Sequence, residues 1–161
     1  MMKTKLCLLV LLFLSLPTLK AQTVISGTDC TSAVLKDLMV KAGIEVIVTQ
    51  PDYIQIVQEP KLQIKTFIDI NAENQWLVFN LANELKVGVP AAQAKDLVLS
   101  INAQTNLIKA TYDEDKNKVE FRYYFMTKGG FTQDALLAAL DMFKTTYLYA
   151  IVTVDSKELF K

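Results

Sequence analysis

One stretch of the sequence, residues 118–149, constrains the fold more than any other. Its first half alternates an apolar set with a more polar set: Val119, Phe121, Tyr123 and Phe125 against Glu120, Arg122, Tyr124 and Met126. That period of two is typical of a half-buried strand. A Gly-Gly pair at 129–130 follows, and then Thr132, a residue type that caps helices by accepting a first-turn amide hydrogen. Phe131 and Leu136 have the spacing of a hydrophobic staple around that cap.

A helix is expected after Thr132, because apolar residues recur every three or four positions. The stripe consists of Leu136, Leu140, Phe143 and Tyr147. A helix with one apolar stripe must bury it against another element. The stretch therefore predicts a strand, a tight turn and a helix that packs on a sheet.

The rest of the chain predicts two more helices and five more strands. The helices are expected at 28–42 and 91–104, and the strands at 45–49, 53–58, 62–70, 76–82 and 106–112. The apolar residues in 76–85 fit both the period of two of a strand and the period of three to four of a helix. The opening Trp-Leu-Val-Phe favours a strand, because these residue types are common in strands. The order α-β-β-β-β-α-β-β-α predicts an α+β fold, a twisted antiparallel sheet with three helices laid on it. Residues 22–27 are interpreted as a polar lead-in, and the tail from Asp155 is expected to fray.

The first 21 residues have the composition of a secretory signal peptide. Lys3 and Lys5 precede an apolar run at 6–16, and the small residue Ala21 stands where cleavage is expected. A membrane anchor is the alternative, but it needs about 20 apolar residues, and the run has eleven. We therefore expect an exported protein, periplasmic or secreted, that keeps no membrane span after cleavage.

Residues 22–161 are expected to form a single domain, since their 140 residues match one domain of ordinary size. They contain 14 basic and 17 acidic residues, a net charge of −3. Nucleic-acid binding depends on dense Lys and Arg contacts with phosphate. A nucleic-acid partner is therefore not expected.

Cys30 is the one cysteine left after signal cleavage, so no intramolecular disulfide can form. In the first turn of the helix expected at 28–42, its thiolate would be favoured by the helix dipole. That placement suggests a reactive or intermolecular thiol. The favoured interpretation is a small apolar residue, because free cysteines often behave as small hydrophobes.

The residue types exclude several kinds of chemistry. The sequence has no histidine, which removes Ser-His-Asp and Cys-His catalysis and His-based zinc sites. Its five glycines form neither a phosphate loop nor a dinucleotide fingerprint. No catalytic residue, cofactor or metal is therefore expected, and the chain is predicted not to be an enzyme.

One acidic segment resembles part of a calcium loop. Asp113, Asp115 and Asn117 match its first, third and fifth positions. Lys118 stands at the sixth position, where glycine is needed, and Tyr124 at the twelfth, where glutamate is needed. A hairpin loop at 113–118 is the favoured interpretation.

Carboxylates alone could still support a hydrolase. Asp69 and Glu120 lie on the polar sides of their predicted strands, so a solvated face is the favoured interpretation of both. A deep cleft that held two of Asp69, Glu73, Asp113 and Glu120 would favour the enzyme.

A surface for binding protein is the remaining hypothesis. Phe67, Tyr124 and Met126 fall opposite the strongest apolar stripes of their strands, and Arg122 lies among them. Single exposed apolar residues need no explanation. A cluster of them on one face of a sheet would suggest a patch that binds a protein segment.

Several segments together resemble the YbjN-like family, whose members are described as sensory transduction regulators of bacteria. They are LSIN at 99–102, LIKATYD at 107–113, VEFRY at 119–123 and GGFT at 129–132. Residues 38–48 look like that family's opening of helix, glycine and Val-rich strand. The resemblance covers about residues 30–150 and implies a fold similar to that of type III secretion chaperones, which are usually non-enzymatic and often dimeric. The export signal is a departure from the family.

Taken together, these features predict an exported, non-catalytic domain that binds a protein or peptide, in a chaperone-like or envelope sensory role. A carboxylate-only hydrolase and a self-assembling envelope component are the alternatives.

Overall fold

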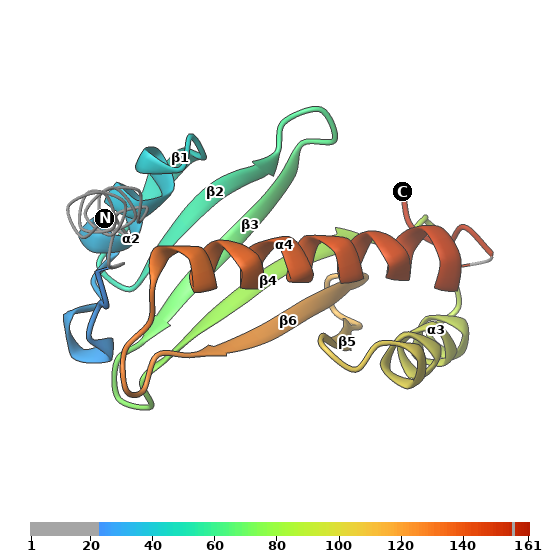
Figure 1. Ribbon diagram of the computed structural model, residues 1–161. Helices are drawn as coiled ribbons and strands as arrows, with labels where there is room; N and C mark the ends of the chain where they lie inside the picture. The colour runs from blue at the N-terminus through green and yellow to red at the C-terminus, as the bar shows by residue number, and fades with distance from the viewer. Residues whose placement is uncertain (1–22, 156) are drawn as a thin grey trace, which may run out of the picture.

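The computed structural model describes residues 23–155 and 157–161 (Figure 1). Three α-helices lie in this part of the chain: α2 (Ser32–Lys41), α3 (Ala91–Gln104) and α4 (Gln133–Tyr149). The six strands are β1 (Glu45–Thr49), β2 (Tyr53–Glu59), β3 (Ile64–Asn71), β4 (Trp76–Glu84), β5 (Lys109–Asp113) and β6 (Lys118–Met126). The predicted fold class and element order are confirmed. The signal peptide predicted at 1–21 lies outside the described residues.

The six strands form one sheet in the order β1-β2-β3-β4-β6-β5, and every described pairing is antiparallel. Strands β1 to β4 follow one another as hairpins, because short polar turns join them. Strand β6 then pairs with β4 along its whole length, from Trp76 opposite Met126 to Glu84 opposite Lys118. The ambiguous segment at 76–85 is therefore a strand up to Glu84.

Helix α4 lies across one face of this sheet (Figure 1). All four residues of its predicted stripe are buried. The fully buried Phe79 of β4 has its ring centroid 6.1 Å from that of Phe143, and Phe121 of β6 has its centroid 5.1 Å from that of Tyr147. The buried residues of α2 and α3 belong to the same core.

Helix α4 continues into a π-helical turn, η2 (Ala150–Val154). The segment Gln133–Val154 is long and apolar enough, by length and composition, to cross a membrane. Its apolar stripe lies in the core against the sheet, and 33% of its most apolar 18-residue window is buried.

Two predicted helix ends are confirmed. The Thr132 hydroxyl accepts from the amide of Ala135 at 3.2 Å and caps α4. Gly43 ends α2 with a φ of 75°, and the amide of Ile44 donates to the carbonyl of Met39 at 2.9 Å. That bond closes a Schellman motif, which needs a left-handed residue at the glycine.

The start of the first helix was predicted wrongly. A short 3-10 turn, η1 (Gly27–Asp29), comes first, and α2 begins at Ser32 with Thr31 as its cap. Cys30 therefore precedes the helix and lies buried in the core. Burial raises the pKa of its thiol to about 11, so the structure favours a small apolar residue over a reactive thiol.

Cys30 should consequently react slowly with thiol reagents in the folded protein. At pH 8 we expect alkylation of the native chain roughly 100-fold slower than in urea, because the thiolate is the nucleophile and burial suppresses it. The unfolded thiol also ionises first, so stability should fall as the pH rises from about 9 to about 11. Iodoacetamide kinetics followed by mass spectrometry measures the ratio, and equal native and unfolded rates would contradict it.

The supposed lead-in, of which residues 23–27 are described, is part of the fold. Ile25 pairs with Phe131, with amide-to-carbonyl distances of 2.8 and 2.9 Å in the two directions. Gly27 is buried against the backbone of Thr127. Gly130 has a φ of 91° and lies so close to Val24 and Ile25 that a side chain would collide with them.

The tail does not fray either. The amide of Lys86 donates to Leu159 at 2.8 Å, and that of Lys161 donates to Glu84 at 3.1 Å. Phe160 pairs with Leu85 and is buried, with its ring centroid 5.9 Å from that of Phe121. The tail is thus fixed against the end of β4.

Two strand starts also differ from prediction. Strand β3 begins at Ile64 because the preceding turn occupies residues 60–63. Leu62 lies in this turn and is 61% exposed. Strand β5 begins at Lys109, three residues later than expected. The Asn102 side chain of α3 donates to the carbonyl of Ala110 at 2.9 Å and accepts from its amide at 2.8 Å, which fixes where β5 meets the helix.

Candidate binding face of the sheet

The face of the sheet opposite α4 carries residues that alternate with the buried ones along β2, β3, β4 and β6. We call it the open face and define it by these residues: Tyr53, Gln55, Phe67, Asp69, Trp76, Val78, Asn80, Arg122, Tyr124 and Met126. Each of them is half-buried or exposed. Their partners in the alternation, such as Ile54, Ile68 and Phe79, are fully buried in the core.

The structure brings the four predicted binding residues onto this one face. Phe67 and Arg122 lie in the same cross-strand row, with Asn80 of β4 between them. Tyr124 and Met126 follow Arg122 along β6 and are 46% and 57% exposed. Phe67 is only half-buried.

Sequence reasoning missed three apolar members of the open face. Tyr53 has its ring centroid 5.8 Å from that of Phe67. Trp76 meets Tyr124 edge to face at 5.6 Å, and Val78 lies opposite Tyr124. The signal was present, because residues 76–82 were predicted as a strand and the alternation that places Leu77 and Phe79 inside also places Trp76 and Val78 outside.

Asp69 lies between these aromatic pairs. It is half-buried, opposite Tyr53 on one side and Val78 on the other. Burial raises its pKa and the nearby charge of Asp52 adds to the rise, although a hydrogen bond from the Asn80 amide and the charge of Arg122 act against it. Asp69 thus lies on the sheet face away from the helices, as predicted, but it is half-buried there and not fully solvated.

Glu120 has a different setting. Its carboxylate lies 2.8 Å from the Lys118 ammonium and 2.8 Å from the Arg122 guanidinium. The hydrogen bond from Lys118 is the main reason why its pKa falls below the ordinary value. Glu120 is thus an ionised partner of two cations, which suits an ion pair better than proton transfer.

Asp113 and Glu73 complete the set of acidic residues that the sequence analysis considered. Asp113 lies opposite Lys118, the cation that also pairs with Glu120. The Asp113 carboxylate accepts from the Lys116 amide at 3.1 Å and lies 3.2 Å from the Lys116 ammonium. Asn117 adopts a φ of 48° and accepts from the Tyr112 hydroxyl at 3.3 Å. These residues shape the predicted hairpin loop, and Glu73 lies exposed in the turn between β3 and β4.

Two pockets lie away from the open face. One of about 430 Å³ lies between α2 and the start of α4, and another of about 440 Å³ lies between the end of α3 and α4. None of Asp69, Glu73, Asp113 and Glu120 lines either of them.

The fold is also found among solved structures. No protein-family model matches the chain, and neither does any curated protein. The chain is similar to the crystal structure of YbjN from E. coli, described there as a candidate transcription regulator, with a TM-score of 0.69 and 17% identity. The similarity covers 86% of this chain and 99% of that one. The chain therefore has a YbjN-like fold.

Proposed function

We propose that the protein is a non-catalytic binding domain that holds a segment of another protein on its open face. The observation that carries the proposal is a half-buried carboxylate, Asp69, between two aromatic pairs on a sheet face. Clustered apolar residues on a surface are typical of interaction sites. Aromatic residues and Met are enriched in such interfaces.

The chemistry of the open face favours a segment with apolar anchors and a Lys or Arg. Asp69 and Asp52 place negative charge beside the Tyr53 and Phe67 rings. A cation that contacted these rings would gain a cation–π interaction and the charge of Asp69 together. Ring faces around Trp76 would accept the apolar anchors.

Export to the periplasm or secretion remains part of the proposal, on the composition of residues 1–21. The YbjN-like fold is compatible with a regulatory or binding role. A second copy of this chain is an alternative occupant of the open face, and light scattering at rising concentration distinguishes it. Such self-association would support the structural-component alternative.

A capture experiment with two matched triple variants tests the proposal. One variant replaces Phe67, Tyr124 and Met126 by alanine. The control replaces exposed apolar residues on the helical side by alanine, namely Leu99, Met142 and Val152, which are 67%, 42% and 76% exposed. The immobilised proteins select from a displayed library of random peptides.

We expect the wild type and the control to select peptides rich in apolar and basic residues, and the open-face variant to lose that selection. If the open-face variant selected the same peptides as the wild type, the proposal would be contradicted. Circular dichroism of all three proteins confirms that they are folded.

Asp69→Asn should leave the fold as stable as wild type or more stable at pH 7. The pKa of Asp69 is higher in the folded state than in the unfolded state. As the pH rises, the unfolded chain therefore loses this proton first. The free energy of unfolding then falls once the pH exceeds the ordinary pKa of an Asp carboxyl. The Asn80 amide can still donate to a carbonyl oxygen at position 69. We expect the gap between the melting temperatures to narrow from pH 7 to pH 4.

A carboxylate that costs stability suits a binding role, because sites often keep residues that the fold alone would not favour. A marked drop in the melting temperature of the Asn variant at pH 7 would instead make Asp69 a structural residue.

A further inference from the structure

The open face continues past β6 onto the edge strand β5, where two cations lie side by side. Lys109 of β5 is directly opposite Arg122 of β6, so the two side chains point to the same face of the sheet. Both residues are exposed. Like charges directly opposite one another in a sheet are destabilising. The free protein therefore carries a repulsive pair at this end of the open face.

The neighbouring helix fixes the position of this pair. The Asn102 side chain of α3 donates to the carbonyl of Ala110 at 2.9 Å and accepts from its amide at 2.8 Å, so these two backbone groups point away from β6. The alternation along the strand then directs the backbone groups of Lys109 toward β6, and its Cα lies about 5.5 Å from that of Arg122. Lysines are common on edge strands because they discourage pairing with another chain. Here Asn102 already closes this part of the edge, so the lysine needs another explanation.

The carboxylate beside this pair already has its own partners. Glu120 gives one oxygen to the Lys118 ammonium at 2.8 Å and the other to the Arg122 guanidinium at 2.8 Å. Among the described residues, no acidic side chain forms an ion pair with Lys109. Arg122 keeps N–H groups for a further acceptor, because a guanidinium carries several donors. Lys109 and Arg122 can therefore hold a carboxylate from outside the chain.

The opposite end of the open face is acidic. Asp69 lies there on β3, and the negative charge of Asp52 acts on it. Strand β4 separates β3 from β6, and Asp69 lies one row along the strands from the row that ends in Arg122 and Lys109. With strands about 4.8 Å apart and residues about 3.4 Å apart, the middle of the cation pair lies about 14 Å from Asp69. The open face thus has a negative end and a positive end.

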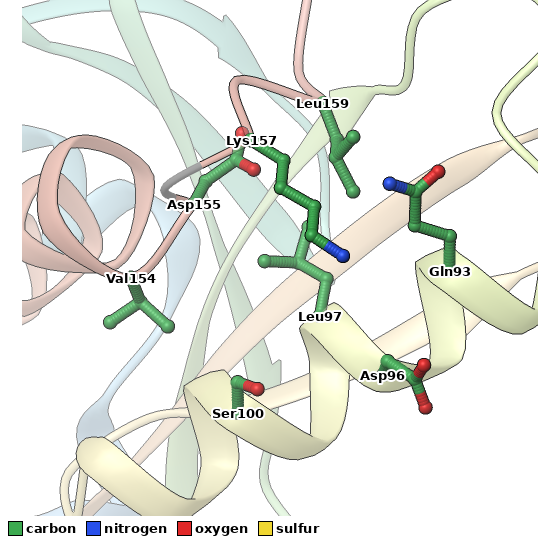
Figure 2. Close-up of a pocket in the computed structure, with 8 residues that line it drawn as sticks. All are labelled: Gln93, Asp96, Leu97, Ser100, Val154, Asp155, Lys157 and Leu159. Atoms are coloured by element: carbon green, nitrogen blue, oxygen red, sulfur yellow. The ribbon is translucent and has the colours of Figure 1, made fainter.

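A small pocket of about 80 Å³ between the C-terminal tail and α3 is another region with charged residues (Figure 2). Lys157 is the basic residue of its lining. The Asp155 carboxylate lies on the tail side of this space (Figure 2), is 4% exposed and accepts from the amide of Phe160 at 3.1 Å. Asp155 therefore holds the tail in place, and the lining presents no pair of like charges for a partner to neutralise.

The charges of the open face indicate a second feature of its partner, an inference that rests on the function proposed above. We propose that the bound segment carries a Glu or Asp side chain between Arg122 and Lys109, four residues from the basic side chain at Asp69. An extended chain advances about 3.4 Å per residue, so four residues span about 14 Å. Residues four apart also project to the same side of an extended segment. Binding replaces the repulsion between two cations with hydrogen bonds from both to one carboxylate.

Calorimetry with short synthetic peptides tests the proposal. Their ends are acetylated and amidated, so terminal charges take no part. Each peptide has Phe and Leu anchors and one Lys, with Glu four positions away in one peptide and Gln in its match, and both chain orders are made. In one of the two orders we expect the Glu peptide to bind the wild type about 5-fold more tightly than its match, the upper end of the range for exposed ion pairs. Added salt should reduce this preference.

A charge reversal at Lys109 tests the same contact from the side of the protein. Lys109→Glu should fold as the wild type does, because the lysine is exposed and repelled by its cross-strand neighbour. It should lose the preference for the Glu peptide and bind a peptide with Lys at that position more tightly. Lys36→Glu, at an exposed position of α2, is the matched control and should keep the wild-type preference.

The outcomes separate this inference from the proposed function. Equal binding of the Glu and Gln peptides in both orders, or an unchanged preference in Lys109→Glu, would overturn the inference. The proposed function would still stand if the Phe67, Tyr124 and Met126 triple alanine variant lost binding of both peptides. If that triple variant bound the peptides as the wild type does, or if the wild type bound none of them, both would fail.

Discussion

Replacement of Phe160 by alanine is expected to lower the free energy of unfolding by about 3 kcal/mol. Phe160 lies one residue from the end of the chain, yet it is 8% exposed and contacts the ring of Phe121. The substitution leaves a cavity where the tail closes the core against β4. Urea unfolding followed by tryptophan fluorescence measures the change.

Lys161→Ala is the matched control, since the Lys161 ammonium pairs with Glu84 at an exposed position. Exposed ion pairs contribute about 0–1 kcal/mol. If the two variants had equal stability, the tail would not pack as the structure has it.

Gly27→Ala is the second substitution with a large expected effect. A Cβ at Gly27 would lie 2.5 Å from the carbonyl oxygen of Thr127, and this neighbour is backbone, which cannot rotate away. We expect a loss of about 2–3 kcal/mol, the upper part of the range for overpacking. Thermal unfolding by calorimetry measures it.

Gly88→Ala separates this collision from ordinary glycine effects. Gly88 has a φ of 88° and open space around it, so alanine there meets backbone strain alone, at about 1 kcal/mol. If Gly27→Ala were as stable as Gly88→Ala or more stable, the N-terminal segment would not pack onto the Gly-Gly turn as the structure has it.

The sequence predicts this fold well where its signals are local. The alternation in 118–126, the Thr132 cap and the stripe that follows are each set by neighbouring residues, and all three are confirmed. The order of the elements follows from the same kind of signal.

Prediction was wrong where contacts join distant parts of the chain. Ile25 pairs with Phe131, which is 106 positions further along the chain, and the nearby Gly27 lies against the backbone of Thr127. The return of Phe160 onto Leu85 is also long-range. A short polar segment or a charged tail contains no pattern that indicates such a partner. The lead-in at 22–27 and the tail from Asp155 were therefore both predicted not to pack on the domain.

The candidate site shows the same division. Strand alternation was enough to place Phe67, Tyr124 and Met126 opposite the buried stripes of their own strands, and the pairing of β3, β4 and β6 brings them together with Arg122 on one face. The burial of Asp69 depends on residues of neighbouring strands, Tyr53 and Val78, whose register the sequence does not give.

The central claim is that the open face is the binding surface. Amide-shift mapping by NMR with a selected apolar, basic peptide tests it most directly. Our account predicts shifts that cluster on β2, β3, β4 and β6 around Phe67, Asp69 and Tyr124, and that disappear in the Phe67, Tyr124 and Met126 triple alanine variant. Shifts confined to the helical side, around Leu99 and Met142, would contradict it.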